Sequence, residues 1–290
     1  MKKVIIIFLT SIVLISCGKE KDSNPQEYVF GLKFNSYSLD LSYLNLNSLE
    51  TTNNRLLINT GILFRGTFDG LKYYYASVGD TIFEIDITKN TISKKFKSSD
   101  SLLYIFKDYD TNEIIGVSVL NDTINISKLS LVAGTQSLIK TSLTSHTENF
   151  MTDVNYNSID KTLIIKIGND VNIIDIVNGA RISKFEMQNV IHGLSYSNSE
   201  KRLYFLEFSN NELKFKKCDL SGNEKYSELI GEDIVAFYAD NLVLTDTGEY
   251  IFVAINKDQK NYLYRISSDN VSKTEIVNYE SIFGFSYIKK

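Results

Sequence analysis

Residues 151–187 of the chain read MTDVNYNSIDKTLIIKIGNDVNIIDIVNGARISKFEM. The stretch holds four short apolar segments, around Val154 and at residues 162–167, 171–176 and 181–185. Polar turns separate these segments, at Asn157 to Lys161, Gly168-Asn169-Asp170 and Asn178-Gly179. β-Branched residues suit strands, whereas Gly, Asn and Asp suit the turns between strands. The stretch therefore predicts one antiparallel sheet of four strands.

The same order of strands and turns recurs along the chain. The next copy has strands at Ile191–Tyr196, Leu203–Phe208, Leu213–Leu220 and Tyr226–Ile230, and further copies cover about 57–96, 102–143 and 235–277. Three third strands end alike and set the register, at Ile85-Asp86-Ile87, Ile174-Asp175-Ile176 and Cys218-Asp219-Leu220, with Leu44-Asn45-Leu46 as a fourth instance. An Asp or Asn at that point can accept hydrogen bonds from the turn that follows it.

The two ends of the chain each hold part of a copy. Tyr28 to Leu49 supplies the last three strands of a unit, and Ser281 to Ile288 supplies a lone first strand. Repeated four-stranded sheets of roughly forty to fifty residues are typical of β-propellers. First strands near Leu57, Leu102, Phe150, Ile191, Val235 and Ile282 predict an all-β, six-bladed β-propeller, closed where the last strand joins the N-terminal partial blade. A pair of β-sandwiches or a β-helix would not explain a partial unit at each end.

The N-terminus has the pattern of a secretory signal. Lys2 and Lys3 precede about twelve mostly apolar residues, Val4 to Ile15, and charged residues follow from Lys19. A membrane-spanning helix needs roughly twenty apolar residues, so this segment is too short to be one. An ordinary signal peptide that happens to end near a cysteine, or a short membrane anchor, remains the alternative.

The junction Leu14-Ile15-Ser16-Cys17 resembles the lipobox of bacterial lipoproteins. The resemblance implies cleavage before Cys17, a thioether-linked diacylglycerol on Cys17 and acylation of the new N-terminus by a chain such as palmitate. Gly18 stands where Asp would resemble an inner-membrane retention signal, so the outer membrane is expected. The cluster Lys19-Glu20-Lys21-Asp22 resembles the tether of surface lipoproteins in the Bacteroides and Flavobacterium group. The expected organisation is a signal peptide over 1–16, a lipidated tether over 17–27 and the propeller over 28–290.

The whole chain resembles the six-bladed β-propeller lipoproteins of that bacterial group. It lacks the Trp-Asp dipeptide of WD40 blades, since it contains no Trp, and it lacks the hallmarks of kelch repeats. The resemblance informs location and fold rather than activity. The location it implies is the outer membrane, at the cell surface or on the periplasmic side.

Charge and cysteine content narrow the possible partners. The formal net charge of −4 includes Lys2 and Lys3, so the mature chain would be more acidic still, which argues against nucleic acid. With Cys17 lipidated, Cys218 would have no internal disulfide partner and is expected to be a small buried residue. We expect a monomer held on a membrane by its lipid.

The junctions between blades are the candidate ligand site. Propellers bind ligands where loops gather around the central channel, and such loops carry function more often than strands do. The polar and charged side chains at the junctions are Arg55, Asp100, His146, Glu148, His192, Glu232, Asp233 and Glu280. Together they predict an acidic, histidine-bearing mouth for a cation or a polyhydroxylated ligand. The simpler interpretation is that exposed loops carry charge.

Other chemical motifs are weak. The string from Asp108 to Glu113 begins like a calcium loop, but Glu113 stands where the loop needs Gly and Val119 where it needs Glu, so a hairpin turn is favoured. No nucleophile elbow, zinc-protease, phosphate-loop or dinucleotide motif is present. The run Tyr73-Tyr74-Tyr75 suits either sugar stacking or strand packing, and packing is favoured.

Three functional hypotheses follow. The first is a non-catalytic binding or scaffolding propeller in the envelope, with a small polar, carbohydrate or protein ligand, and it explains the missing catalytic motifs. The second is an enzyme resembling sugar lactonases or sugar dehydrogenases, with calcium at a mouth that contains His146 and His192. The third is an accessory subunit of an outer-membrane transport or assembly complex. We expect no cofactor beyond the lipid, and a binding protein rather than an enzyme.

Overall fold

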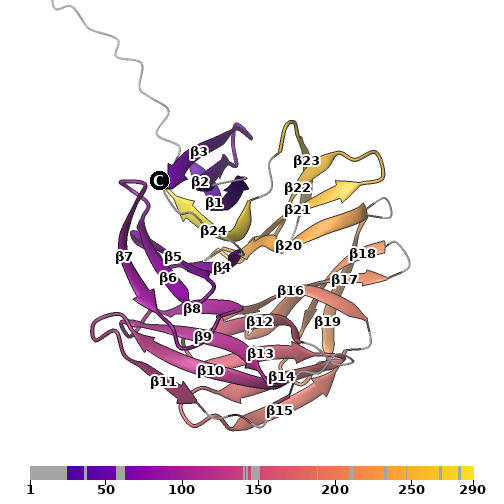
Figure 1. The fold of residues 1–290 in the computed structure, drawn as a ribbon. Coiled ribbons are helices and arrows are strands. Elements are labelled where there is room, and N and C mark those ends of the chain that lie inside the picture. Colours follow the sequence, from indigo (N-terminus) through magenta and orange to yellow (C-terminus); the bar gives the residue numbers. More distant parts are fainter. Residues whose placement is uncertain are drawn as a thin grey trace, which may run out of the picture.

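A computed structural model describes residues 25–35, 38–56, 63–139, 141, 143–144, 151–187, 189–209, 212–231, 234–245, 247–267, 270–279 and 282–290. These residues form six antiparallel sheets of four strands each, arranged around an axis as the blades of a propeller (Figure 1). The predicted fold is confirmed. Within the described residues, no helix has the length and apolar character needed to cross a bilayer.

Each blade has one inner strand and three further strands, and the ranges follow from the inner strand outward. Blade 1 contains β24 (Phe283–Lys289), β1 (Glu27–Asn35), β2 (Ser38–Asn45) and β3 (Thr51–Leu56). Blade 2 contains β4 (Leu63–Phe68), β5 (Tyr73–Val78), β6 (Thr81–Asp86) and β7 (Thr91–Lys97). Blade 3 contains β8 (Tyr104–Asp108), β9 (Glu113–Leu120), β10 (Thr123–Ser130) and β11 (Gln136–Ile139).

The second half of the ring repeats this plan. Blade 4 contains β12 (Met151–Asn157), β13 (Thr162–Ile167), β14 (Asp170–Asp175) and β15 (Arg181–Glu186). Blade 5 contains β16 (Val190–Ser197), β17 (Arg202–Ser209), β18 (Glu212–Cys218) and β19 (Glu224–Gly231). Blade 6 contains β20 (Ile234–Leu244), β21 (Tyr250–Asn256), β22 (Asn261–Ile266) and β23 (Val271–Ile276).

Blade 1 closes the ring, as the sequence predicts. The C-terminal strand β24 pairs antiparallel with β1, in a register that places Tyr28 opposite Ile288. The partial unit at the N-terminus is longer than expected, because it ends at Leu56 rather than at Leu49. Its last strand, β3, reads TTNNRL and is largely exposed. The sequence of an outer strand need not alternate between apolar and polar residues, because solvent covers the strand. The polar sequence of β3 therefore looks like that of a loop.

The second blade also begins later than the sequence suggests. Its first strand, β4, begins at Leu63, whereas Leu57 lies outside the described residues. The other first strands begin within two residues of their expected positions. The predicted role of the Asp or Asn at the ends of the third strands is confirmed, because its side chain accepts a hydrogen bond from the turn that follows. Asn45 Oδ1 accepts from the amide of Ser48, Asp86 Oδ1 from that of Thr88 and Asp219 Oδ1 from that of Ser221.

The hydrophobic core lies between the blades. Six clusters of buried residues each join two neighbouring blades; one, for example, packs Phe30 and Leu41 of blade 1 against Tyr74 and Ile85 of blade 2. The middle strands are therefore buried on both faces and read as continuous apolar runs. The outer strands have polar sequences because solvent covers them. This ring of interfaces holds the inner strands around a central channel.

Candidate functional site

The structure places a cavity of about 700 Å³ at one end of the central channel. Residues from all six inner strands line it, together with turns that connect first to second strands, such as Gly70, Tyr109, Ser158 and Asn198. Because neighbouring strands are antiparallel, first-to-second and third-to-fourth turns lie at one end of the ring, which we call the turn face. The blade junctions and second-to-third turns lie at the opposite end, the junction face.

Three inner strands build the cavity wall with one short motif. It reads Asp153-Val154-Asn155-Tyr156 in β12, Gly193-Leu194-Ser195-Tyr196 in β16 and Gly284-Phe285-Ser286-Tyr287 in β24. The pairing register shifts at each copy, which marks a β-bulge. In each copy the apolar second residue is buried and the small polar third residue lies on the cavity wall. Sequence comparison of the six repeats contains this signal, which a search for catalytic motifs does not detect.

Polar side chains of one inner strand satisfy the backbone of the next. Neighbouring inner strands belong to different sheets, so their facing amides need other partners. Asp153 Oδ2 accepts from the Leu194 amide at 2.8 Å, and Asn155 Oδ1 accepts from the Tyr196 amide at 3.2 Å. Thr67 Oγ1 accepts from the Lys107 amide at 3.2 Å. These bonds fix the orientation of the side chains around the cavity.

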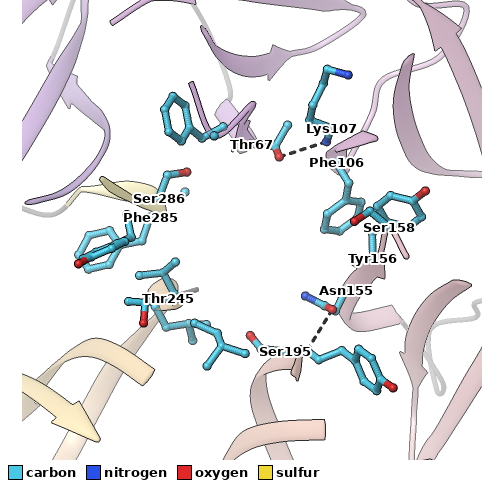
Figure 2. Close-up of a pocket in the computed structure, with 18 of the residues that line it drawn as sticks. Thr67, Phe106, Lys107, Asn155, Tyr156, Ser158, Ser195, Thr245, Phe285 and Ser286 are labelled. Atoms are coloured by element: carbon cyan, nitrogen blue, oxygen red, sulfur yellow. Dashed lines mark hydrogen bonds between the residues drawn. The ribbon is translucent and has the colours of Figure 1, made fainter. Parts of the chain in front are cut away.

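Six residues occupy one level of the channel, one from each inner strand. In each blade, this residue is paired with the equivalent position of the second strand. The six residues are Thr67, Phe106, Asn155, Ser195, Val243 and Ser286. Figure 2 shows the labelled members of this level arranged around an open centre. Four of the six carry an uncharged hydroxyl or amide group. We call these four, Thr67, Asn155, Ser195 and Ser286, the polar ring.

Aromatic side chains form one side of the cavity. The rings of Phe106 and Tyr156 lie 6.1 Å apart at 44°, and both residues line the cavity (Figure 2). Tyr109 lies at the mouth and donates from its hydroxyl to the Phe68 carbonyl at 3.2 Å. Buried among the lining residues, Asn198 Oδ1 has no hydrogen-bond partner within the described part of the chain. The cavity thus combines flat apolar surfaces with hydrogen-bonding groups.

The charged residues of the described lining are Asp153, Lys107 and Lys289, and each has protein partners. Besides Leu194, Asp153 accepts from the Val154 amide at 2.8 Å. Lys107 donates from Nζ to the backbone carbonyls of Asp108 and Thr111, and burial lowers the pKa of its ammonium. Lys289 Nζ lies 3.4 Å from Glu27 Oε1. The cavity therefore offers mainly uncharged groups to a ligand.

The structure describes three of the predicted junction residues, Arg55, Asp100 and His192, and these lie toward the other end of the ring. Arg55 is in β3 and donates from Nε to Ser38 Oγ at 3.3 Å, and Asp100 follows β7, where its amide donates to Ser98 Oγ at 3.4 Å. His192 is half-buried near the start of β16. None of these three belongs to the described lining of the cavity. The remaining predicted residues, His146, Glu148, Glu232, Asp233 and Glu280, and the predicted lipidation site Cys17, lie outside the described residues.

Three smaller predictions are confirmed. The segment from Asp108 to Glu113 is the turn between β8 and β9, and Lys161 Nζ donates to Asp108 and Asp110 at 2.6 and 2.8 Å. Tyr74 and Tyr75 pack in the core, and so does Cys218. Among the described residues, no group of three His, Cys, Asp or Glu side chains is placed to hold a metal ion.

Comparisons with known proteins give the fold. No protein-family model and no curated protein sequence matches the chain. TolB from Acinetobacter baumannii matches with a TM-score of 0.66 and 10% identity over 91% of this chain and 66% of that one, so the chain spans just under two thirds of that protein. A protein of unknown function from Bacteroides caccae matches with a TM-score of 0.66 and 11% identity, over 92% of this chain and 100% of that one. The WD40 domain of Toxoplasma gondii coronin matches with a TM-score of 0.56 and 9% identity, over 86% and 67% of the two chains.

Proposed function

We propose that the protein is a lipid-anchored, non-catalytic binding propeller of the bacterial outer membrane, whose cavity takes an uncharged saccharide. The observation that carries this proposal is the polar ring beside the Phe106 and Tyr156 rings. Hydroxyl and amide groups match the hydroxyls of a sugar, and flat aromatic rings match its apolar faces. The cavity volume of about 700 Å³ is within the ordinary range of small-molecule sites.

The charge of the cavity supports an uncharged ligand. Asp153 and Lys107 already have protein partners, so a charged ligand would have to displace those contacts to find a counterion. Leaving a buried charge without its partner costs several kcal/mol. A neutral ligand avoids this cost, because it needs only hydrogen bonds from the polar ring.

A titration of neutral mono- and oligosaccharides against the purified protein tests the ligand proposal. Ser286 faces the cavity from β24, and Ser286→Leu would place an apolar side chain there and weaken binding about tenfold or more, a loss of about 1.4 kcal/mol. Asp100→Asn on the junction face is the matched control and should bind like the wild type. The proposal fails if no neutral saccharide binds, or if Asp100→Asn weakens binding while Ser286→Leu does not.

The lipid anchor has its own test. Metabolic labelling with a radioactive fatty acid should label the protein, Cys17→Ala should abolish the label, and Cys218→Ala, at the other cysteine, should keep it. Cys17→Ala should also release a folded propeller from the membrane fraction. Persistent labelling of Cys17→Ala would contradict the proposed site. Protease treatment of intact cells would then show whether the propeller is on the cell surface, where it is digested, or on the periplasmic side.

A further inference from the structure

Five large apolar side chains are exposed together on the turn face. Leu71, Tyr109, Val132, Ile159 and Val177 are between 61% and 84% exposed. Single exposed apolar residues are ordinary in soluble proteins, but apolar residues gathered on one face mark an interaction surface. We call these five residues the apolar rim.

The repeat places the apolar rim on three consecutive blades. Leu71, Tyr109 and Ile159 lie in the first-to-second turns of blades 2, 3 and 4. Val132 and Val177 lie in the third-to-fourth turns of blades 3 and 4. Antiparallel strand order brings all these turns to the same end of the ring (Figure 1). The apolar rim thus extends over the turn face of blades 2 to 4, from the first-to-second turns nearest the channel to the outer third-to-fourth turns.

The described residues of the first-to-second turns of blades 5 and 6 include no exposed large apolar side chain. Blade 5 has Asn198 and Ser199 in its first-to-second turn, and blade 6 has Thr247 and Gly248. Turns favour small polar residues and glycine, so blades 5 and 6 follow the usual preference and blades 2 to 4 depart from it. The turn face is therefore apolar on blades 2 to 4 and polar at the first-to-second turns of blades 5 and 6.

Ion pairs compensate charges near the apolar rim. Lys72 lies 3.0 Å from Asp86, and Lys161 lies within 2.8 Å of Asp108 and Asp110. Lys201 lies 3.8 Å from Asp160. These three lysines and four aspartates leave a net charge of −1, so this group of charges would meet little electrostatic repulsion from a zwitterionic lipid layer.

The N-terminal segment that precedes β1 joins the propeller at the turn face, the end of the ring that also carries the apolar rim. The amide of Gln26, just before β1, donates to the Lys290 carbonyl at 2.8 Å, and β24 ends there with Lys289 on the cavity wall. β1 therefore begins at the turn face. Only Gly18 to Asn24 separates Cys17 from Pro25, and a chain of that length spans at most about 30 Å. A lipid on Cys17 would hold the turn face, not the junction face, near the membrane.

From this placement we propose that the apolar rim docks on the phospholipid bilayer that holds the anchor. The proposal rests on the proposed lipidation of Cys17. The propeller would lean toward blades 2 to 4, whose apolar side chains enter the interfacial region of the bilayer. The polar turns of blades 5 and 6 would stay in water and leave the cavity mouth open to a ligand.

Tryptophan substitution tests the docking directly, because the chain has no tryptophan of its own. Ile159→Trp reports on the apolar rim, and Leu120→Trp, at the exposed end of β9 on the junction face, is the matched control. Each lipidated protein is reconstituted into phosphatidylcholine vesicles with and without brominated acyl chains, which quench tryptophan at short range. We expect at least about twofold stronger quenching of Ile159→Trp than of Leu120→Trp, and no loss of the difference at high salt.

A second readout separates the docking face from the anchor. Cys17→Ala protein, which has no lipid, is sedimented with the same vesicles, alone and with Ile159→Glu or Leu120→Glu added. Ile159→Glu should lower the vesicle-bound fraction about tenfold and Leu120→Glu should leave it unchanged. Circular dichroism verifies that each variant is folded.

The outcomes distinguish the two proposals. If mass spectrometry finds no lipid on Cys17, the anchor fails, and the sedimentation comparison still decides the docking face. Equal quenching of the two tryptophans in lipidated protein, or equal sedimentation of the two glutamate variants, overturns the docking proposal and leaves the anchor standing. Such a result would assign the apolar rim to a protein partner instead.

Discussion

Arg265 and Glu27 are 238 positions apart in the sequence, yet Arg265 Nη2 donates to Glu27 Oε2 at 2.9 Å. Arg265 lies in β22 of blade 6 and Glu27 begins β1 of blade 1, so the bond joins the two blades where the ring closes. Arg265 also forms two hydrogen bonds with Glu249, at 2.7 and 2.6 Å. Tyr287 of β24 donates to the other oxygen of Glu27 at 2.9 Å. Hydrogen bonds among Arg265, Glu27, Glu249 and Tyr287 thus accompany the strand pairing that closes the ring, and we call these four residues the polar clamp.

Arg265→Ala should destabilise the propeller by about 2 kcal/mol, because it leaves the partly buried carboxylates of Glu27 and Glu249 without their guanidinium partner. The measurement is the free energy of unfolding in urea. Lys260→Ala is the control, since its ion pair with Glu275 is well exposed and should contribute less than about 1 kcal/mol. Equal effects of the two substitutions would mean that the clamp adds nothing beyond a surface ion pair.

Acid should weaken the same clamp. Burial opposes ionisation of Glu27, but the hydrogen bonds from Arg265 and Tyr287 outweigh it and hold the pKa of that carboxyl below its usual value. A carboxyl with a lowered folded-state pKa stabilises the fold above its unfolded-state pKa, near 4.3, and this contribution is lost as the pH falls through the folded-state pKa. Arg265→Ala should therefore unfold with a shallower loss of stability below about pH 4 than the wild type. Parallel acid-unfolding curves would contradict this role of Glu27.

Gly193→Ala should destabilise the ring much more than Gly134→Ala. Both glycines have a φ of +66°, but an added Cβ at Gly193 would lie 2.2 Å from Leu242 and 2.3 Å from Tyr250 Oη, whereas Gly134 has nothing within 4 Å. Gly134→Ala should cost about 1 kcal/mol of backbone strain, and Gly193→Ala at least about 2 kcal/mol more from overpacking. Thermal unfolding measures both, and similar melting temperatures would argue against close packing at this bulge.

Tyr250→Phe tests the hydrogen bond from the Tyr250 hydroxyl of blade 6 to the Gly193 carbonyl of blade 5. Tyr250 is fully buried and donates from its hydroxyl to the Gly193 carbonyl of blade 5. Removing the hydroxyl should cost about 1 kcal/mol, because the buried carbonyl loses one of its two donors and keeps the Ser195 hydroxyl at 3.3 Å, while the phenyl ring keeps its packing. Urea unfolding gives the value. A change below about 0.5 kcal/mol would mean that the Ser195 hydroxyl alone satisfies the carbonyl.

Cys218 should resist thiol reagents until the propeller unfolds. Its side chain is buried at the end of β18, and burial raises the pKa of the thiol to about 12. The thiolate is the reactive form, so at pH 8 the folded protein should react orders of magnitude more slowly than the unfolded chain, whose thiol has a pKa near 8.5. Labelling of Cys17→Ala protein in increasing urea should follow the unfolding transition. Rapid labelling without denaturant would reveal local opening of blade 5.

The sequence predicts the strands and turns of a blade where the residues that determine them are close together in the chain. Asp86, Asp175 and Asp219 end third strands because each carboxylate binds the amides of its own turn, within a few residues. The polar outer strand β3 was mistaken for a loop because an exposed strand needs no apolar alternation. Its ends depend on pairing with β2, which a local pattern does not encode.

The cavity could be located only from the tertiary structure. The junction residues were candidates because they are charged, whereas the cavity is lined by uncharged side chains such as Asn155 and Ser195, which have no distinctive chemistry in sequence. The motif that carries them recurs with Asp153 in one blade and Gly193 in another, so it emerges from an alignment of the repeats and not from any single copy. The structure gathers these residues from blades far apart in the chain.

The sequence by itself determined the all-β repeat, the number of blades and the closure of the ring by the last strand, because strand periodicity and turn chemistry act over a few residues. It also contains Leu14-Ile15-Ser16-Cys17, a local pattern that resembles a lipobox and from which the anchor is predicted. Only the tertiary structure decided which end of the channel forms the cavity, and that the start of β1 lies at the same end as the apolar rim. These relations depend on the direction of each strand around a closed ring, which brings together side chains that the sequence keeps dozens to hundreds of residues apart.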